Sequence, residues 1–173
     1  MSSFQAQTAA AISSIRPFVS LKLISTPPHI QARFSVGRHF TVTNNAMHEL
    51  PSNHIFDRVM NRWAQRTDPL WWSSVAFIKA SSHRVVRSYM SRRVRLAWIE
   101  SMRKQGWARD GSRLPGSKQQ ADLVGTLQMN AMISVLKLSP EELERTTDTI
   151  LQTVIQIAQK GPVTNPRRRK WNS

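Results

Sequence analysis

The sequence of 173 residues contains no cysteine. This absence excludes a disulfide-stapled scaffold, a thiol nucleophile, an iron–sulfur centre and every zinc site with thiolate ligands. Hydrophobic residues make up 40% of the chain, which is enough to build a core, so the chain is not disordered as a whole. The length fits one domain with flanking tails.

Acidic residues are scarce. The chain has 10 Asp and Glu against 25 Lys and Arg, which gives a formal charge of +15, and the first acid is Glu49. A charge of this size favours an anionic partner, either nucleic acid or an acidic membrane surface.

Long apolar runs and enzyme motifs are also missing. The most membrane-like run, residues 70–78, is nine residues long, whereas a membrane-spanning helix needs about 20. The histidines show neither HxH nor HExxH spacing, and Gly106, Gly111 and Gly116 match no phosphate-binding glycine loop. We therefore expect a soluble or peripheral protein that is not an enzyme and binds no metal or cofactor.

The acid-free N-terminal segment is typical of a mitochondrial presequence. Apolar residues recur at near-helical spacing from Phe4 to Phe18, among basic and hydroxyl side chains. An arginine two residues before Ser35 resembles a matrix-peptidase site with the cut after Phe34. We therefore expect residues 1–34 to be a presequence, which places the protein in the mitochondrial matrix. A disordered basic N-terminus and a plastid presequence remain alternatives.

The rest of the chain predicts an all-α fold, because no clear alternation of apolar and polar residues marks a strand. We expect a small bundle of about four helices with a long basic second helix. The expected segments are a linker over 35–51, a helical domain over 52–160 and a basic disordered tail over 161–173.

Capping residues set the helix boundaries. Asp68-Pro69 predicts the start of the second helix, which runs to about residue 105 unless it breaks at Ser81-Ser82. A third helix is expected over 118–138. The fourth starts most clearly, because Ser139-Pro140-Glu141-Glu142 combines an N-cap, a first-turn proline and a capping-box glutamate.

The basic part of the second helix is the main candidate site. Arginine forks fit phosphate oxygens, and Trp98, one turn beyond Arg95, is expected to stack on an unpaired base. A solvated basic face with a core tryptophan, or contact with lipid headgroups, are the alternatives. The predicted RNA-binding residues of this region are Lys79, Arg84, Arg87, Arg92, Arg93, Arg95 and Trp98.

Two further segments are candidate contact surfaces. The tail carries four contiguous bases that are expected to order on RNA, although such a run also resembles a nuclear-localisation patch. The third helix has a second apolar stripe, which is expected to bind a protein partner. The tail residues are Arg167, Arg168, Arg169 and Lys170, and the stripe residues are Met129, Met132, Ile133 and Leu136.

These features predict a non-enzymatic RNA-binding protein of the mitochondrial matrix, a component or assembly factor of the mitochondrial ribosome. Its expected partners are structured ribosomal RNA and neighbouring ribosomal proteins. In composition, though not in any motif, the chain is similar to accessory proteins of mitochondrial ribosomes. DNA reading by the last helix is not expected, because Glu141, Glu142 and Glu144 at its start would repel phosphates. The alternative is an assembly or accessory factor of an inner-membrane respiratory complex, docked by its apolar helices, with the basic face on anionic lipid.

Overall fold

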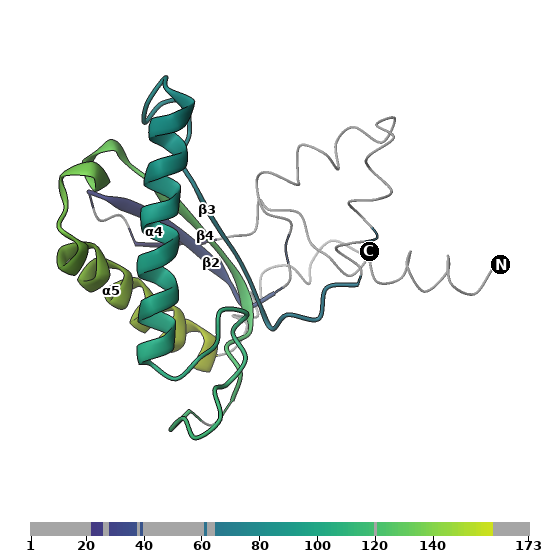
Figure 1. Ribbon diagram of the computed structural model, residues 1–173. Coiled ribbons are helices and arrows are strands. Elements are labelled where there is room, and N and C mark those ends of the chain that lie inside the picture. The colour runs from purple at the N-terminus through teal and green to yellow at the C-terminus, as the bar shows by residue number, and fades with distance from the viewer. Residues whose placement is uncertain are drawn as a thin grey trace.

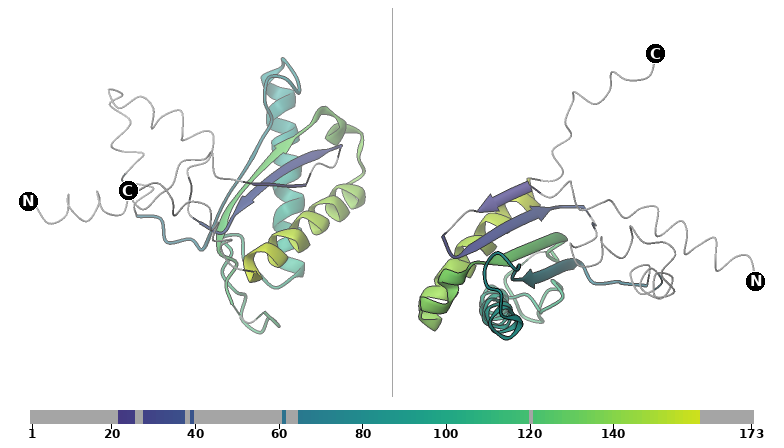
Figure 2. Two further views of the ribbon diagram at one scale, coloured as in Figure 1. Left: turned by 180° about the vertical axis from the view of Figure 1, so that it is seen from behind. Right: turned by 90° about the horizontal axis from the view of Figure 1, so that it is seen from above.

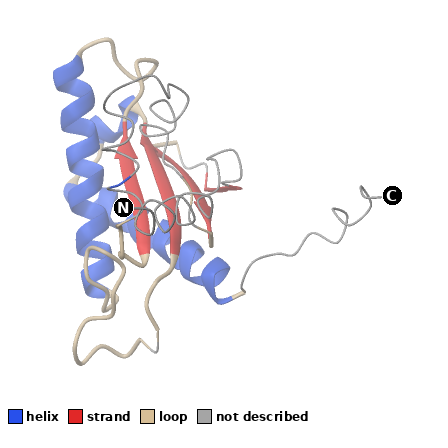
Figure 3. Cartoon of the chain, turned by 90° about the vertical axis from the view of Figure 1, so that its right-hand side faces the viewer, coloured by secondary structure: helices blue, strands red, loops and turns tan. Residues whose placement is uncertain are grey.

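The computed structural model describes residues 22–25, 28–37, 39, 61, 65–119 and 121–160. They form a four-stranded sheet with two long helices, which both cover the same face of the sheet (Figures 1 and 3). The prediction of an all-α bundle is therefore wrong, and the fold is mixed α/β. The elements are β1 (Lys22–Ser25), β2 (Ile30–Ser35), β3 (Leu70–Val75), α4 (Arg84–Lys104), β4 (Gly125–Ala131), the 3₁₀ helix η2 (Ile133–Lys137) and α5 (Pro140–Gln159).

The strand order is β1-β2-β4-β3, so that β2 and β4 are central and β3 lies at an edge. Antiparallel pairing joins β1 to β2 and β2 to β4, whereas β3 and β4 run parallel. Parallel neighbours need a crossover connection, and α4 supplies it. The view from above shows both helices beneath the strands (Figure 2).

The expected third helix is replaced by β4 and η2. From Gly125 to Ala131 small or apolar residues alternate with Thr126, Gln128 and Asn130. Leu127 and Met129 are fully buried in the core, because alternate side chains of a strand point to the same face. A spacing of four fits both a helix and every second position of a strand, so the apolar stripe alone was ambiguous.

The expected long second helix is divided into β3 and α4. The run Leu70–Val75 pairs along its whole length with β4, and α4 begins only at Arg84. Tryptophan, serine and valine are weak helix formers, and partners across a sheet decide their conformation. The expected end of this helix is confirmed, since Lys104 is its last residue and Gly106 follows with φ +92°. A first helix was expected after a cap at Ser52-Asn53, with apolar residues from Ile55 to Trp63, and it lies almost entirely outside the described residues.

The fourth helix is confirmed as α5. The Ser139 hydroxyl accepts from the Glu142 backbone N–H (3.2 Å), and the Glu142 carboxylate accepts from the Ser139 N–H (2.8 Å). This reciprocal pair is the expected capping box. The buried face of α5 packs on α4, and the core combines both helices with one face of the sheet. Its main side chains are Ile30, Phe34, Leu70, Met90, Val94, Trp98, Leu127, Met129, Leu143, Ile150, Leu151 and Val154.

The N-terminal strands overlap the expected presequence. Residues 22–25 and 30–34 belong to β1 and β2, and β2 pairs with β4 over six residue pairs from Ile30 to Ser35. Ile30 and Phe34 are 0% and 1% exposed. The boundary expected after Phe34 therefore falls inside a central strand, and the folded unit extends over residues on both sides of it.

Candidate nucleic-acid interface

The five arginines of α4 that were predicted to bind RNA fall into two groups, and one group is engaged in structural hydrogen bonds. Arg93 donates from Nη1 to the carbonyls of Val135 (2.9 Å) and Leu136 (3.3 Å) and from Nη2 to that of Leu138 (2.6 Å). The end of a short helix leaves carbonyls without partners, and here a guanidinium from α4 satisfies them. The guanidinium group of Arg93, which was predicted to bind RNA, thus joins α4 to η2.

Arg87 has a comparable role near the N-terminal end of α4. Its Nη1 donates to the carbonyls of Ser81 (2.9 Å) and Ser82 (2.7 Å), in the turn that leads into the helix. The remaining predicted side chains of this region do not make such bonds and are exposed. They are Lys79, Arg84, Arg92 and Arg95.

A groove runs between α4 and the edge strand β3, and we call it the β3–α4 groove. Among the described residues, its first part, of about 690 Å³, is lined by five arginines and by no acidic side chain, and we call it the arginine section. Small side chains such as Ser88 and Ser91 lie between the arginines and leave the helix backbone approachable. The five arginines are Arg84, Arg87, Arg92, Arg95 and Arg109.

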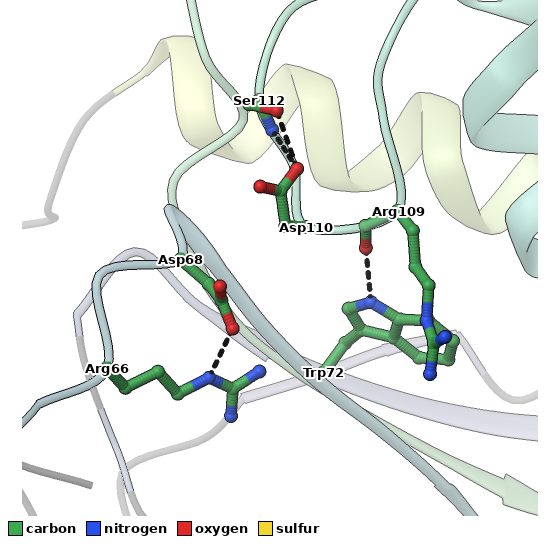
Figure 4. A network of polar contacts seen from close by, with 6 residues as sticks. All are labelled: Arg66, Asp68, Trp72, Arg109, Asp110 and Ser112. Atoms are coloured by element: carbon green, nitrogen blue, oxygen red, sulfur yellow. Dashed lines mark hydrogen bonds and ion pairs between the residues drawn. The ribbon is translucent and has the colours of Figure 1, made fainter. Parts of the chain in front are cut away.

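The second part, of about 860 Å³, contains both signs of charge, and we call it the mixed section. It shares four lining residues with the arginine section, so the two parts are continuous; these are Ser74, Val75, Arg95 and Arg109. Figure 4 shows its polar contacts, in which Asp68 accepts from Arg66 Nε (2.7 Å). Asp110 accepts from the N–H (3.0 Å) and hydroxyl (2.6 Å) of Ser112, and these bonds lower the pKa of Asp110 below its usual value. Both carboxylates therefore already have donors.

Arg109 belongs to the groove although the sequence analysis did not select it. It lies in the loop after α4, which is tied to β3 where Leu70 N–H donates to the Asp110 carbonyl (2.9 Å). Gly111 allows this close approach, since it has φ +87° and a Cβ there would lie 2.5 Å from the Leu70 Cβ. No local pattern in the sequence predicts Arg109 as a site residue. The loop lies beside β3 only in the folded protein, and residue periodicity reports only on contacts between near neighbours in the chain.

Charge on α4 is unequally compensated along the helix. At its C-terminal end Lys104 pairs with Glu144 of α5, and this hydrogen bond, with Asp148 nearby, raises the pKa of Lys104. At its N-terminal end the first turn has no acidic residue and His83 makes no side-chain cap. The positive end of the helix dipole therefore adds to the field of Arg84 beside the arginine section.

Trp98 is a core residue, and this corrects its expected stacking role. Its side chain is 0% exposed and belongs to the core cluster with Met90, Val94 and Leu127. A base cannot reach a fully buried indole. The aromatic residue that does line the groove is Trp72 of β3, which is half-buried.

The expected partner-binding stripe is also divided by the fold. Met129 points into the core from β4 and is 0% exposed, so it contacts no partner. Three members remain at the surface around η2, with exposed fractions from 37% to 50%; they are Met132, Ile133 and Leu136. The four tail bases, Arg167 to Lys170, lie outside the described residues.

Among the residues that the structure describes, no three histidine or acidic side chains gather in a way that could hold a metal ion. In the same part of the chain, no helix has the length and apolarity needed to cross a membrane. No protein-family model matches this sequence, and neither a curated protein nor a solved structure shows significant similarity to it.

Proposed function

We propose that this protein binds RNA through the β3–α4 groove, with exposed arginines on the phosphate backbone, and that it is not an enzyme. The observation that carries the proposal is the arginine section, which is lined by five arginines and to which none of the described residues contributes a carboxylate. Three of them, Arg84, Arg92 and Arg95, make no backbone hydrogen bond of the kind that occupies Arg87 and Arg93. Concentrated, uncompensated guanidinium groups favour a polyanion and fit phosphate oxygens in pairs.

The cellular setting that we propose is the mitochondrial ribosome or its assembly. The acid-free N-terminus supports import into the matrix, and the net charge of +15 supports association with ribosomal RNA. Neighbouring ribosomal proteins are the proposed protein partners, and the exposed residues around η2, Met132, Ile133 and Leu136, are the proposed contact.

Salt dependence tests the phosphate contact. The groove variant carries Arg84→Gln, Arg92→Gln and Arg95→Gln. On structured RNA it should flatten the slope of log K against log salt by roughly two to three units, because each phosphate contact contributes about 0.7 to 0.9. The control variant Lys118→Gln, Lys137→Gln, Arg145→Gln removes the same charge from exposed positions outside the groove. It should leave most of the slope in place. Equal slopes for the parent and the groove variant would contradict the proposal.

The setting needs a separate experiment. Tagged protein from mitochondrial lysate should sediment with ribosomal particles, and RNase treatment should abolish this sedimentation. Association with membranes that salt releases and RNase does not would instead favour the respiratory-complex alternative. In that case the apolar residues around η2 would be the docking surface, and the arginine section would contact anionic lipid.

A further inference from the structure

The two sections of the β3–α4 groove differ in the ligand group that they can accept. In the part of the chain that the structure describes, the arginine section has five guanidinium groups and no carboxylate, so it suits phosphates. The mixed section contains Asp68 and Asp110, whose negative charge disfavours a phosphate at close range. It also contains Trp72, which is the one aromatic side chain that the described residues contribute to the lining of either section. A neutral, flat group such as a nucleobase is compatible with both features.

Trp72 is held in place by the protein before any ligand binds. Its Nε1–H donates to the Arg109 carbonyl (2.8 Å), and its ring packs at 6.4 Å from the buried ring of Trp98, tilted by 55°. Figure 4 shows the indole beneath the loop that carries Arg109 and Asp110. The indole thus has one side anchored on the core while it still lines the groove, so little side-chain entropy is lost when a base stacks on it.

The order of charges along the groove fits an RNA strand whose base lies in the mixed section and whose phosphates continue into the arginine section. Arg95 and Arg109 line both sections and therefore lie where the ligand passes from one section to the other. Phosphates that follow on from the base would meet these two arginines first and then Arg84 and Arg92 of the arginine section. Base edges carry amino donors, and the free oxygen of the Asp68 carboxylate is an acceptor of the right kind.

We propose that the ligand of this groove is a single-stranded segment of RNA, with an unpaired base stacked on Trp72 and its phosphates on the arginines of α4 and Arg109. This inference rests on the proposed function and narrows it from RNA in general to unpaired nucleotides. In a duplex the bases are stacked on one another and cannot enter the mixed section.

An abasic strand tests base stacking separately from phosphate binding. The probes are a short oligouridylate and an abasic oligoribonucleotide of the same length, which has the same phosphates and no bases. The full-length protein should bind the base-bearing strand roughly five- to a hundredfold more tightly, because stacking on an aromatic contributes at this level. The salt slopes for the two strands should be equal, since the phosphate contacts are shared.

Two substitutions at Trp72 test the residue itself. Trp72→Phe and Trp72→Leu both lose the hydrogen bond to the Arg109 carbonyl, and only the phenylalanine retains an aromatic face. The phenylalanine variant should keep most of the preference for the base-bearing strand, while the leucine variant should lose it and still bind the abasic strand like the parent. Thermal unfolding of both variants shows whether the fold is retained, and the parent comparison does not depend on either variant.

The results of these experiments distinguish a failure of base stacking on Trp72 from a failure of RNA binding by the groove. Equal affinity of the parent for both strands, or a preference that survives in a folded Trp72→Leu variant, overturns the stacked base while phosphate binding stands. If the parent binds neither strand and the groove variant behaves like the parent on structured RNA, then the proposed function fails as well.

Discussion

The ring centroids of Trp72 and Trp98 lie 6.4 Å apart, one at the groove and the other inside the core. Trp72 comes from the edge strand and Trp98 from the helix that crosses over it, so their contact fixes the distance between β3 and α4. The floor of the β3–α4 groove is therefore set by core packing, and a change at Trp98 is expected to affect the site through the fold and not through contact with a ligand.

Trp98→Ala should destabilise the protein by about 3–5 kcal/mol, because it removes a fully buried indole and leaves a cavity. Chemical denaturation with urea measures the loss. Leu96→Ala is the matched control on the same helix, since Leu96 is 58% exposed and its truncation should change stability by less than about 0.5 kcal/mol. Similar midpoints for the two variants would mean that α4 presents a different face to the core.

Two adjacent arginines should behave oppositely. Arg93→Gln should lower the free energy of unfolding by about 1–3 kcal/mol, because the carbonyls that end η2 lose their guanidinium donor. Arg92→Gln should leave unfolding unchanged and weaken RNA binding, since Arg92 is exposed in the arginine section. Denaturation and RNA titration of both variants give the comparison. An Arg93 variant as stable as the parent would show that the tie between α4 and η2 is dispensable.

The capping box of α5 gives a third prediction. Ser139→Ala removes the acceptor for the Glu142 N–H and should cost about 0.5–2 kcal/mol of stability. Thr149→Ala serves as the control, because that exposed hydroxyl only bonds back to the Arg145 carbonyl within the helix. Leu151→Ala, on the buried face, should cost about 2–5 kcal/mol. If the Ser139→Ala and Leu151→Ala variants both have the same free energy of unfolding as the parent, then α5 does not pack as the structure places it.

The position of β2 gives a prediction for proteolytic processing. Cleavage after Phe34 would remove β1 and all but Ser35 of β2, including five of the six residue pairs with β4. It would also remove three side chains that are at most 1% exposed, those of Ile30, Ala32 and Phe34. The loss is of the same order as the net stability of an ordinary domain, which is about 5–15 kcal/mol. N-terminal sequencing of protein from mitochondria should therefore find a start at or before Lys22.

Deletion variants check the same point outside the organelle. A chain that lacks residues 1–21 retains all four strands and should unfold cooperatively, whereas one that lacks residues 1–34 should be insoluble or unfolded. A soluble, cooperatively folded chain that starts at Ser35 would show that β2 is not needed for the core. In that case the processing site predicted from the sequence would be compatible with the fold.

Local signals predicted the parts of the structure that depend on neighbours in the chain. The start of α5 was predictable because Ser139, Pro140 and Glu142 satisfy backbone groups within one turn. The arginine-rich stretch from Arg84 to Arg95 was correctly placed in a helix because its apolar residues, such as Met90 and Val94, recur at helical spacing. The end of that helix before Gly106 also follows from a residue that tolerates a positive φ.

The strands could not be assigned from local signals alone. Leu127 and Ala131 fit one face of a helix and one face of a strand equally well, and the choice depends on pairing with β2, almost a hundred positions earlier in the chain. The segment around Phe34 resembled a cleavage motif because such a motif is short and local. Its burial is decided by α5 and β4, which lie far away in the sequence.

The sequence by itself determined the net charge, the helical arginine cluster and the boundaries of α5, because these follow from composition and from contacts within a few residues. Only the tertiary structure decided that Arg93 is not available, since backbone carbonyls of a segment far along the chain, at Val135, Leu136 and Leu138, occupy its guanidinium group. It also placed Arg109 and Trp72 beside the helix and buried Trp98. The physical reason is that burial and pairing are properties of non-local contacts, which no window of sequence contains.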